Sequence, residues 1–257
     1  ISARIAEDIG FEIGMFAGSI ASMTVLGAPD LIVLTLSEFC EQAHRVCRAS
    51  GLALLVDADH GYGNALSVKR TVEELETAGV SALTIEDTRL PKTYSNEKTT
   101  ALLSLEEGVG KMKAALEGRS DNSLIITART SAFSVTNDED ALVRAKAYEA
   151  AGVDALFFAG ISTRAQIELL NASISIPIFI APKGNEIIDL TYLADKGVKI
   201  CLQSHQPFLA SVQAIYTTLK ALREGTTPSK IRSIASNELM KEVTRSEEYE
   251  RLTKDYL

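Results

Sequence analysis

The most informative segment of the sequence is Leu54-Leu-Val-Asp57-Ala-Asp59-His60-Gly-Tyr-Gly63-Asn64. A short apolar segment ends there in two carboxylates, a histidine and a glycine-rich turn. Continuous apolar segments of this length are typical of strands buried on both faces, as in a parallel sheet. Functional side chains of such sheets gather at the carboxyl ends of the strands. The stretch therefore predicts a buried strand that ends at the rim of a site.

The same pattern recurs along the chain, with apolar strand-like segments alternating with amphipathic helical ones. The predicted strands are 13–17, 53–57, 82–86, 124–128, 155–159, 177–180 and 198–202, and the predicted helices are 36–49, 65–78, 105–117, 138–151, 164–172 and 190–196. Gly79, Gly152 and Gly197 each lie between a helix end and the next strand, where a left-handed residue is needed. This alternation predicts a parallel sheet covered by helices on its outer face.

We predict one α/β domain over residues 1–257, a (β/α)8 TIM barrel whose first strand lies upstream of Ile1. A doubly wound open sheet has the same alternation and is the structural alternative. The barrel is favoured because polar residues follow five of the strands, and only a barrel brings all those strand ends to one mouth. Residues 211–257 are helical in pattern and rich in charge, and we expect them to form a C-terminal extension.

Composition restricts the class of protein. The 257 residues are 46% hydrophobic and 23% charged, with a formal charge of −8, and the pI is near 5.1. An acidic chain is a poor partner for nucleic acid, and no apolar run is long enough to span a membrane. Three cysteines without metal-ligand spacing favour a reducing compartment, so we expect a cytoplasmic location. The spacing of Gly61 and Gly63 does not match a dinucleotide-binding motif.

Three carboxylates predict a metal site at the strand ends. Asp57 and Asp59 are two residues apart, so on a strand they would share a face, and Glu86 ends the next predicted strand. Hard oxygen ligands suit Mg²⁺, with Mn²⁺ as a substitute, and Mg²⁺ takes only one or two carboxylates directly. We expect Asp57 to bind the ion while Asp59 and Glu86 hold its waters. The alternative is that each acid makes a turn or caps a helix.

Four further side chains are candidates for the same site. Arg129 can pair with a carboxylate or stabilise an enolate oxygen, and its alternative role is a salt bridge to a rim acid. Ser19 follows a strand on a small turn, where it can contact an anionic substrate or cap a helix. His205 follows the last strand and would point into the same mouth. We expect His60 to orient a carboxylate from behind, and His44 to lie on the surface.

These motifs together resemble the isocitrate lyase and phosphoenolpyruvate mutase superfamily, most closely its oxaloacetate decarboxylase branch. The resemblance covers nearly the whole chain. It rests on Ser2-Ala-Arg-Ile-Ala6, Gly10-Phe-Glu12, Gly18-Ser-Ile-Ala-Ser22, Thr35-Leu-Ser-Glu-Phe39, Asp57 to Asn64, Leu83-Thr-Ile-Glu-Asp87 and Ala128-Arg-Thr130.

The resemblance implies a Mg²⁺-dependent enzyme that decarboxylates oxaloacetate to pyruvate and CO₂. It implies that Asp57 binds the metal, that Asp59 and Glu86 hold its waters, and that Ser19, Arg129 and His205 contact the α-keto acid. It also implies a homotetramer, a dimer of dimers, in which the last barrel helix is exchanged between subunits.

The loop 89–98 bears on the reaction. Lyases of the superfamily carry a cysteine there as general acid, and this loop has none, which disfavours isocitrate or methylisocitrate cleavage. The loop is also similar to that of the mutases and phosphonopyruvate hydrolases, with Tyr94 where they have asparagine, so a phosphonate substrate is the alternative. Ala17, Ser131 and Gln203 depart from the family pattern, and a catalytically weakened barrel that only binds α-keto acids is the other alternative.

Overall fold

The computed structural model describes residues 1–92, 94, 100–184 and 187–257. Seven parallel strands form one sheet in the order β1 to β7, each hydrogen-bonded to the next in the chain. They are β1 (Ile13–Phe16), β2 (Ala53–Asp57), β3 (Ala82–Glu86), β4 (Ile125–Thr130), β5 (Ala155–Ala159), β6 (Ile178–Ala181) and β7 (Val198–Cys201). The predicted α/β class and strand order are confirmed. An eighth strand upstream of Ile1 stays a prediction.

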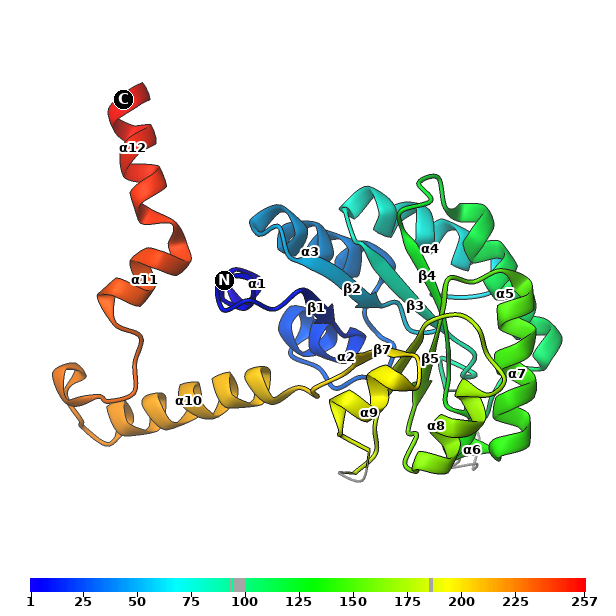
Figure 1. Ribbon diagram of the computed structural model, residues 1–257. Coiled ribbons are helices and arrows are strands. Elements are labelled where there is room, and N and C mark those ends of the chain that lie inside the picture. The colour runs from blue at the N-terminus through cyan, green and yellow to red at the C-terminus, as the bar shows by residue number, and fades with distance from the viewer. Residues whose placement is uncertain (93, 95–99, 185–186) are drawn as a thin grey trace. The chain divides into compact units, whose positions relative to one another are not determined.

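Helices lie between the strands and cover the outer face of the curled sheet (Figure 1). They are α2 (Gly18–Ala21), a π-helix (Ser22–Leu26), α3 (Leu36–Ala49), α4 (Ala65–Ala78), α5 (Leu105–Gly118), α6 (Ala132–Val135), α7 (Asp138–Ala151), α8 (Arg164–Asn171) and α9 (Leu190–Asp195). Gly79, Gly152 and Gly197 have φ values of 90°, 98° and 80°, which confirms the predicted left-handed turns. None of the described helices is both long enough and apolar enough to cross a bilayer.

Side chains alternate between the two faces of the sheet. Leu55, Ala155, Phe157 and Phe179 form a small cluster on one face, the interior of the curl. Their strand neighbours, such as Val56, Leu156 and Phe158, pack on the opposite face in the larger cluster with the helices. Each strand thus has an inner and an outer set of residues. Asp57, Glu86 and Arg129 belong to the inner set.

The chain divides into two compact units. One is Glu12–Ser204, which contains the whole sheet, and the other is Ile1–Phe11 with His205–Leu257. The second unit holds α1 (Ser2–Asp8), α10 (Gln206–Arg223), a 3-10 turn (Pro228–Lys230), α11 (Asn237–Thr244) and α12 (Ser246–Tyr256). In this unit Arg245 binds Asp8 through both terminal guanidinium nitrogens, at 2.7 and 2.8 Å, which joins the two ends of the chain. The C-terminal helices begin at Gln206, five residues before the start that we predicted.

Candidate functional site

Three neighbouring strands bring their last inner residues together. Asp57 ends β2, Glu86 ends β3, and Arg129 is the next-to-last residue of β4. Glu86 and Arg129 are direct partners in the register of β3 and β4, and Asp57 pairs with Thr84. The structure therefore brings together three of the residues that we predicted for the site, at the carboxyl edge of the sheet.

Arg129 is the only cation in direct contact with these strand-end acids among the described residues. Its guanidinium forms a short ion pair with Asp57, and its Nε lies 3.3 Å from a carboxylate oxygen of Glu86 without making a hydrogen bond. The guanidinium carbon also lies 5.4 Å from the centre of the Phe157 ring. Although burial opposes its charge, the two acids raise the pKa of Arg129, so it remains a cation.

The turn after β2 positions Asp59. The backbone N–H of Asp59 donates to Asp57 Oδ1 at 3.2 Å, and its carbonyl accepts from the N–H of Glu86 at 2.8 Å. Asp59 has a φ of 49° and lies beyond the end of β2. Our reason for placing Asp57 and Asp59 on one face was therefore wrong: a left-handed turn, and not strand alternation, holds Asp59 beside the strand ends.

The carboxylate of Asp59 packs on the backbone of Gly18. A Cβ at Gly18 would lie 2.7 Å from both carboxylate oxygens, so only glycine leaves room for them. Burial, and then the charges of Asp57, Asp30 and Glu86, raise the pKa of Asp59 to about 8. Asp30 is a residue that the sequence analysis missed. It lies in the segment between the π-helix and α3, where no periodic pattern marks it.

Ser19 is not on a flexible turn, as we expected, but in the short helix α2, directly after Gly18. The helix begins directly after Ala17, whose backbone is extended with φ −81° and ψ 142°. Since Gly18 contacts Asp59, this first helical turn lies on the rim that carries the acids.

His60 follows Asp59 in the turn and is only 3% exposed, and its predicted role of orienting a carboxylate stays a prediction. Its backbone carbonyl accepts from Lys111 Nζ at 2.8 Å, and its Nδ1 has no hydrogen-bond partner. Burial and the nearby Lys111 charge lower the pKa of His60 to about 4, so the ring is neutral near pH 7. Lys111 is itself 3% exposed, and the sequence analysis missed it because helix α5 carries it toward the turn from the outer layer.

Two predicted parts of the site, His205 and the loop 89–98, stay predictions. His205 precedes α10 in the second unit of the chain, so its predicted place at the barrel mouth stays a prediction. The loop 89–98 includes positions 93 and 95–99, which lie outside the described residues. His44 is exposed on α3, as predicted, and the three cysteines are free.

The donors present fit a small divalent cation. Asp57, Asp59 and Glu86 are three oxygen donors around one guanidinium, and burial raises the pKa of Glu86 as well as that of Asp59. A cation would relieve this crowding of like charges. Among the described side chains, no group of three or more His, Cys, Asp or Glu residues is arranged to hold a metal by itself. A site with one direct carboxylate, the others binding through water, needs no such group.

The chain is similar to known proteins in both sequence and structure. The phosphoenolpyruvate phosphomutase family matches residues 1–223. The chain is 52% identical, over all its 257 residues and 89% of the relative, to a protein of Bradyrhizobium sp. (strain ORS 278) named oxaloacetate decarboxylase. Its structure is similar to that of phosphoenolpyruvate phosphomutase from Streptomyces platensis subsp. rosaceus, with a TM-score of 0.88 and 29% identity over 99% of this chain and 90% of that one.

A second solved structure carries ligands. It is a phosphonopyruvate hydrolase in complex with oxalate and Mg²⁺, with a TM-score of 0.87 and 26% identity over 99% of this chain and 90% of that one.

Proposed function

Because the chain belongs to the phosphoenolpyruvate phosphomutase family, we propose that it is a carboxy-lyase that decarboxylates oxaloacetate to pyruvate and CO₂. One observation carries the proposal. Asp57, Glu86 and Arg129 converge at one edge of the sheet. They do so in a chain whose entire 257 residues match a protein named oxaloacetate decarboxylase.

The proposed cofactor is Mg²⁺, with Mn²⁺ as a substitute. Asp57 would be the direct ligand, and Asp59 and Glu86 would hold the waters of the ion. A bound divalent cation would supply Lewis-acid chemistry for an α-keto acid substrate. The oxygen donors described above support this assignment, as does the Mg²⁺ in the phosphonopyruvate hydrolase.

The chain's own residues stabilise the charge that develops as the C3–C4 bond breaks. The electron pair of that bond becomes the enolate of pyruvate as CO₂ leaves, and water then supplies the proton to C3. Arg129 contacts two of the acids, and in this proposal it donates hydrogen bonds to the enolate oxygen. Ser19 binds the substrate carboxylate from the first turn of α2, and His205 orients the substrate.

The experiment is a substrate panel. Purified protein is incubated with oxaloacetate and Mg²⁺, and pyruvate is followed against a blank with Mg²⁺ but no protein, because the free ion also decarboxylates oxaloacetate. Turnover above the blank supports the proposal. A parallel arm with phosphonopyruvate tests the alternative activity, and phosphate release there without oxaloacetate turnover would replace the proposal. Binding of oxalate without any turnover would indicate a weakened barrel.

We also propose that the enzyme is a homotetramer in the cytoplasm that exchanges its C-terminal helices between subunits. Exposed apolar side chains along α10 support this assembly: Leu209, Val212, Ile215, Tyr216 and Leu219. They recur at three- and four-residue spacing and so form one stripe on the helix. Such a stripe is typical of a helix that packs against another protein surface.

A further inference from the structure

Two site residues are each followed by a polar residue that faces the other way. Glu86 and Arg129 belong to the inner set of the sheet, so Asp87 and Thr130 lie on the outer side, toward the helices. Both are buried, with exposed fractions of 0% and 2%. Polar groups buried between sheet and helices need partners, and those partners come from α7 for Asp87 and from α6 for Thr130.

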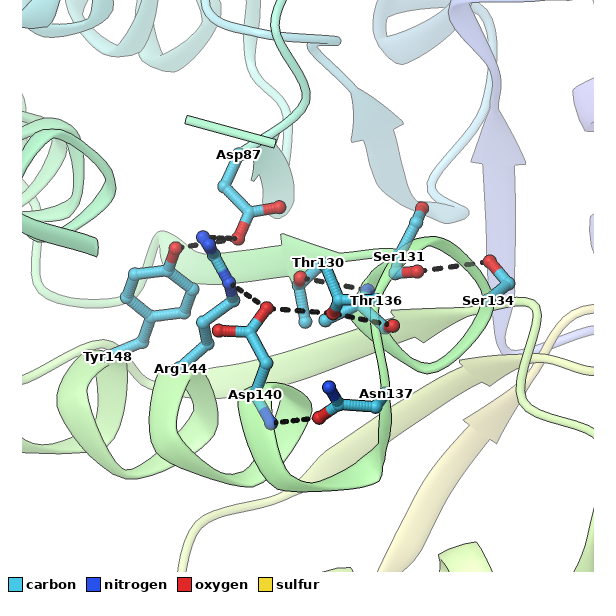
Figure 2. Close-up of polar contacts among 10 residues, drawn as sticks. Asp87, Thr130, Ser131, Ser134, Thr136, Asn137, Asp140, Arg144 and Tyr148 are labelled. Carbon is cyan, nitrogen blue, oxygen red and sulfur yellow. Dashed lines mark hydrogen bonds and ion pairs between the residues drawn. The ribbon is translucent and has the colours of Figure 1, made fainter. Parts of the chain in front are cut away.

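Asp87 is bound by two side chains of α7, one turn apart. Figure 2 shows the phenol of Tyr148 and the guanidinium of Arg144 directed at the same carboxylate. Tyr148 donates to Asp87 Oδ2 at 2.7 Å, and Arg144 Nη1 lies 3.0 Å from the same oxygen. Tyr148 is fully buried and Arg144 is 7% exposed. We call Asp87, Arg144 and Tyr148 the α7 cluster.

A chain of hydrogen bonds leads from the α7 cluster back to β4. Arg144 Nε donates to Asp140 at 2.9 Å, and Asp140 accepts from Thr136 at 2.8 Å. The backbone N–H of Thr136 donates to the carbonyl of Ala132 at 2.8 Å. The N–H of Ala132 in turn donates to Thr130 Oγ1 at 3.2 Å. The residue after Glu86 and the residue after Arg129 are therefore joined through α7 and α6.

The packing around the α7 cluster is specific. A Cβ at Gly108 of α5 would lie 2.3 Å from the hydroxyl of Tyr148, so glycine leaves the space that this hydroxyl occupies. An unpaired carboxylate as deeply buried as Asp87 would be strongly unfavourable, and Arg144 neutralises it. Arg144 also forms an ion pair with Asp140 through its Nε, and a lysine could not contact both carboxylates in the same geometry.

The backbone of Asp87 connects the α7 cluster to both site strands and to the loop above them. Its N–H donates to the carbonyl of Arg129 at 3.2 Å, and its carbonyl accepts from Leu103 at 2.8 Å. The N–H of Arg89 donates to the carbonyl of Ala101 at 2.8 Å. The two ends of the 88–102 segment therefore lie side by side next to Asp87. Asp87 thus lies where β3, β4 and both ends of the 88–102 segment meet.

We propose that Asp87, Arg144 and Tyr148 are positioning residues for the reaction: they hold Glu86 and Arg129 in register and fix the base of the 88–102 segment. The inference rests on the proposed function for its kinetic readout. None of the three touches the reacting atoms in this account. Their effect is on the placement of the strand ends, and small displacements of reacting groups cost large factors in rate.

The kinetic test uses Tyr148→Phe and Arg144→Lys. The first removes the hydroxyl that donates to Asp87, and the second removes the two-nitrogen contact of the guanidinium while it keeps the positive charge. We expect kcat to fall about tenfold or more with KM changed less than about threefold, because substrate contacts remain while the transition state is misplaced.

Two controls are matched. Tyr192→Phe removes a tyrosine hydroxyl bonded to the carbonyl of Arg164. Arg119→Gln breaks the ion pair with Asp154, next to the start of β5 at the opposite end of the strands.

The second readout does not depend on turnover. Amide hydrogen exchange is measured at Asp87, Arg89 and Leu103 in the wild type, in Tyr148→Phe and in Arg119→Gln. We expect exchange at these three amides to become at least about tenfold faster in Tyr148→Phe only, while Arg119→Gln corrects for any general loss of stability.

The outcomes separate the two proposals. An active wild type with an unchanged kcat in Tyr148→Phe, or unchanged exchange at the three amides, overturns the positioning role. A wild type without decarboxylase activity overturns the proposed function, and the exchange measurement then decides the positioning role alone.

Discussion

At the scale of the residue, the site is defined by an excess of carboxylates around Arg129. Asp57 and Glu86 contact the guanidinium, and Asp59 lies beside them against Gly18. Burial and like charges raise the pKa of Asp59 to about 8, far above the ordinary range of a carboxyl group. The strand ends thus hold several buried carboxylates that repel one another, and such strongly perturbed pKa values are typical of functional sites.

Gly18→Ala tests the close packing of Asp59. The new Cβ would lie 2.7 Å from both carboxylate oxygens, so Asp59 must move. We expect kcat/KM for oxaloacetate to fall about tenfold or more, since misplaced groups in a site commonly cost that much. The thermal midpoint should change little because Asp59 lies at the rim. Steady-state kinetics and calorimetry check both parts, and a variant with wild-type kinetics would show that the position of Asp59 does not matter.

His60 predicts a pH dependence of stability. The pKa of His60 is about 4 in the folded chain, against 6.5 for an ordinary histidine. Between pH 6.5 and pH 4 the histidine is therefore protonated in the unfolded state but neutral in the folded state. Its contribution to stability is therefore intact above pH 6.5 and is lost as the pH falls toward 4, by about 3 kcal/mol. Urea unfolding of wild type and His60→Asn, in chelator at pH 7 and pH 4.5, measures this. Equal losses in the two proteins would contradict it.

Asp57, Glu86 and Arg129 were predictable because each lies at the carboxyl end of an apolar strand, and the carboxyl ends of parallel strands meet at one edge of the sheet. It missed Asp30 and Lys111. Their approach to the site depends on how a loop and a helix pack, which neither periodicity nor spacing encodes. The turn geometry of Asp59 was missed for the same reason, since a φ of 49° at an aspartate leaves no pattern in the sequence.

At the scale of the element, helix boundaries were predictable where the local chemistry is strong. Helices α3, α4 and α7 have the predicted bounds, and each begins after a side chain that accepts from the first turn: Thr35, Asn64 and Asn137. Helix α2 and the π-helix after it were not predicted, because segments of four and five residues are too short to show a period.

A pair of glycines on α5 tests helix packing. A Cβ at Gly118 would lie 2.5 Å from the backbone carbonyl oxygen of Lys69 on α4, whereas a Cβ at Gly110 would meet nothing within 4 Å. We expect Gly118→Ala to lower the free energy of unfolding by about 1–3 kcal/mol, because the two helices must separate. Gly110→Ala should raise it by about 0.5–1 kcal/mol through helix propensity alone. Urea unfolding decides, and equal effects would contradict the close contact of α4 and α5.

At the scale of the whole molecule, the strand order and the covering helices followed from the alternation of segments along the chain. The division into two units did not, because the segments 1–11 and 205–257 lie at opposite ends of the sequence. Contacts that join such distant residues, such as the pair of Arg245 and Asp8, have no local signal.

The apolar stripe of α10 predicts self-association. Ile215 and Leu219 are 59% and 62% exposed in the single chain, and a second subunit would cover them in the proposed assembly. Ile215→Asp with Leu219→Asp should convert the oligomer to smaller species, because charges in an apolar interface are unfavourable. Light scattering coupled to size-exclusion chromatography measures the mass. A wild type that is monomeric at micromolar concentration, or a variant of unchanged mass, would contradict the assembly.

The proposed function depends on Asp57 holding the Mg²⁺ ion with which this chain would decarboxylate oxaloacetate. The most direct measurement is the Mg²⁺ dependence of pyruvate formation by the wild type and by Asp57→Asn, each corrected for a blank without protein, with Arg119→Gln as the folded control. We expect chelator to abolish wild-type turnover, and Asp57→Asn to remain about 10²-fold slower or worse at saturating Mg²⁺ while the control is unaffected. Full activity in chelator, or wild-type turnover by Asp57→Asn, would contradict it.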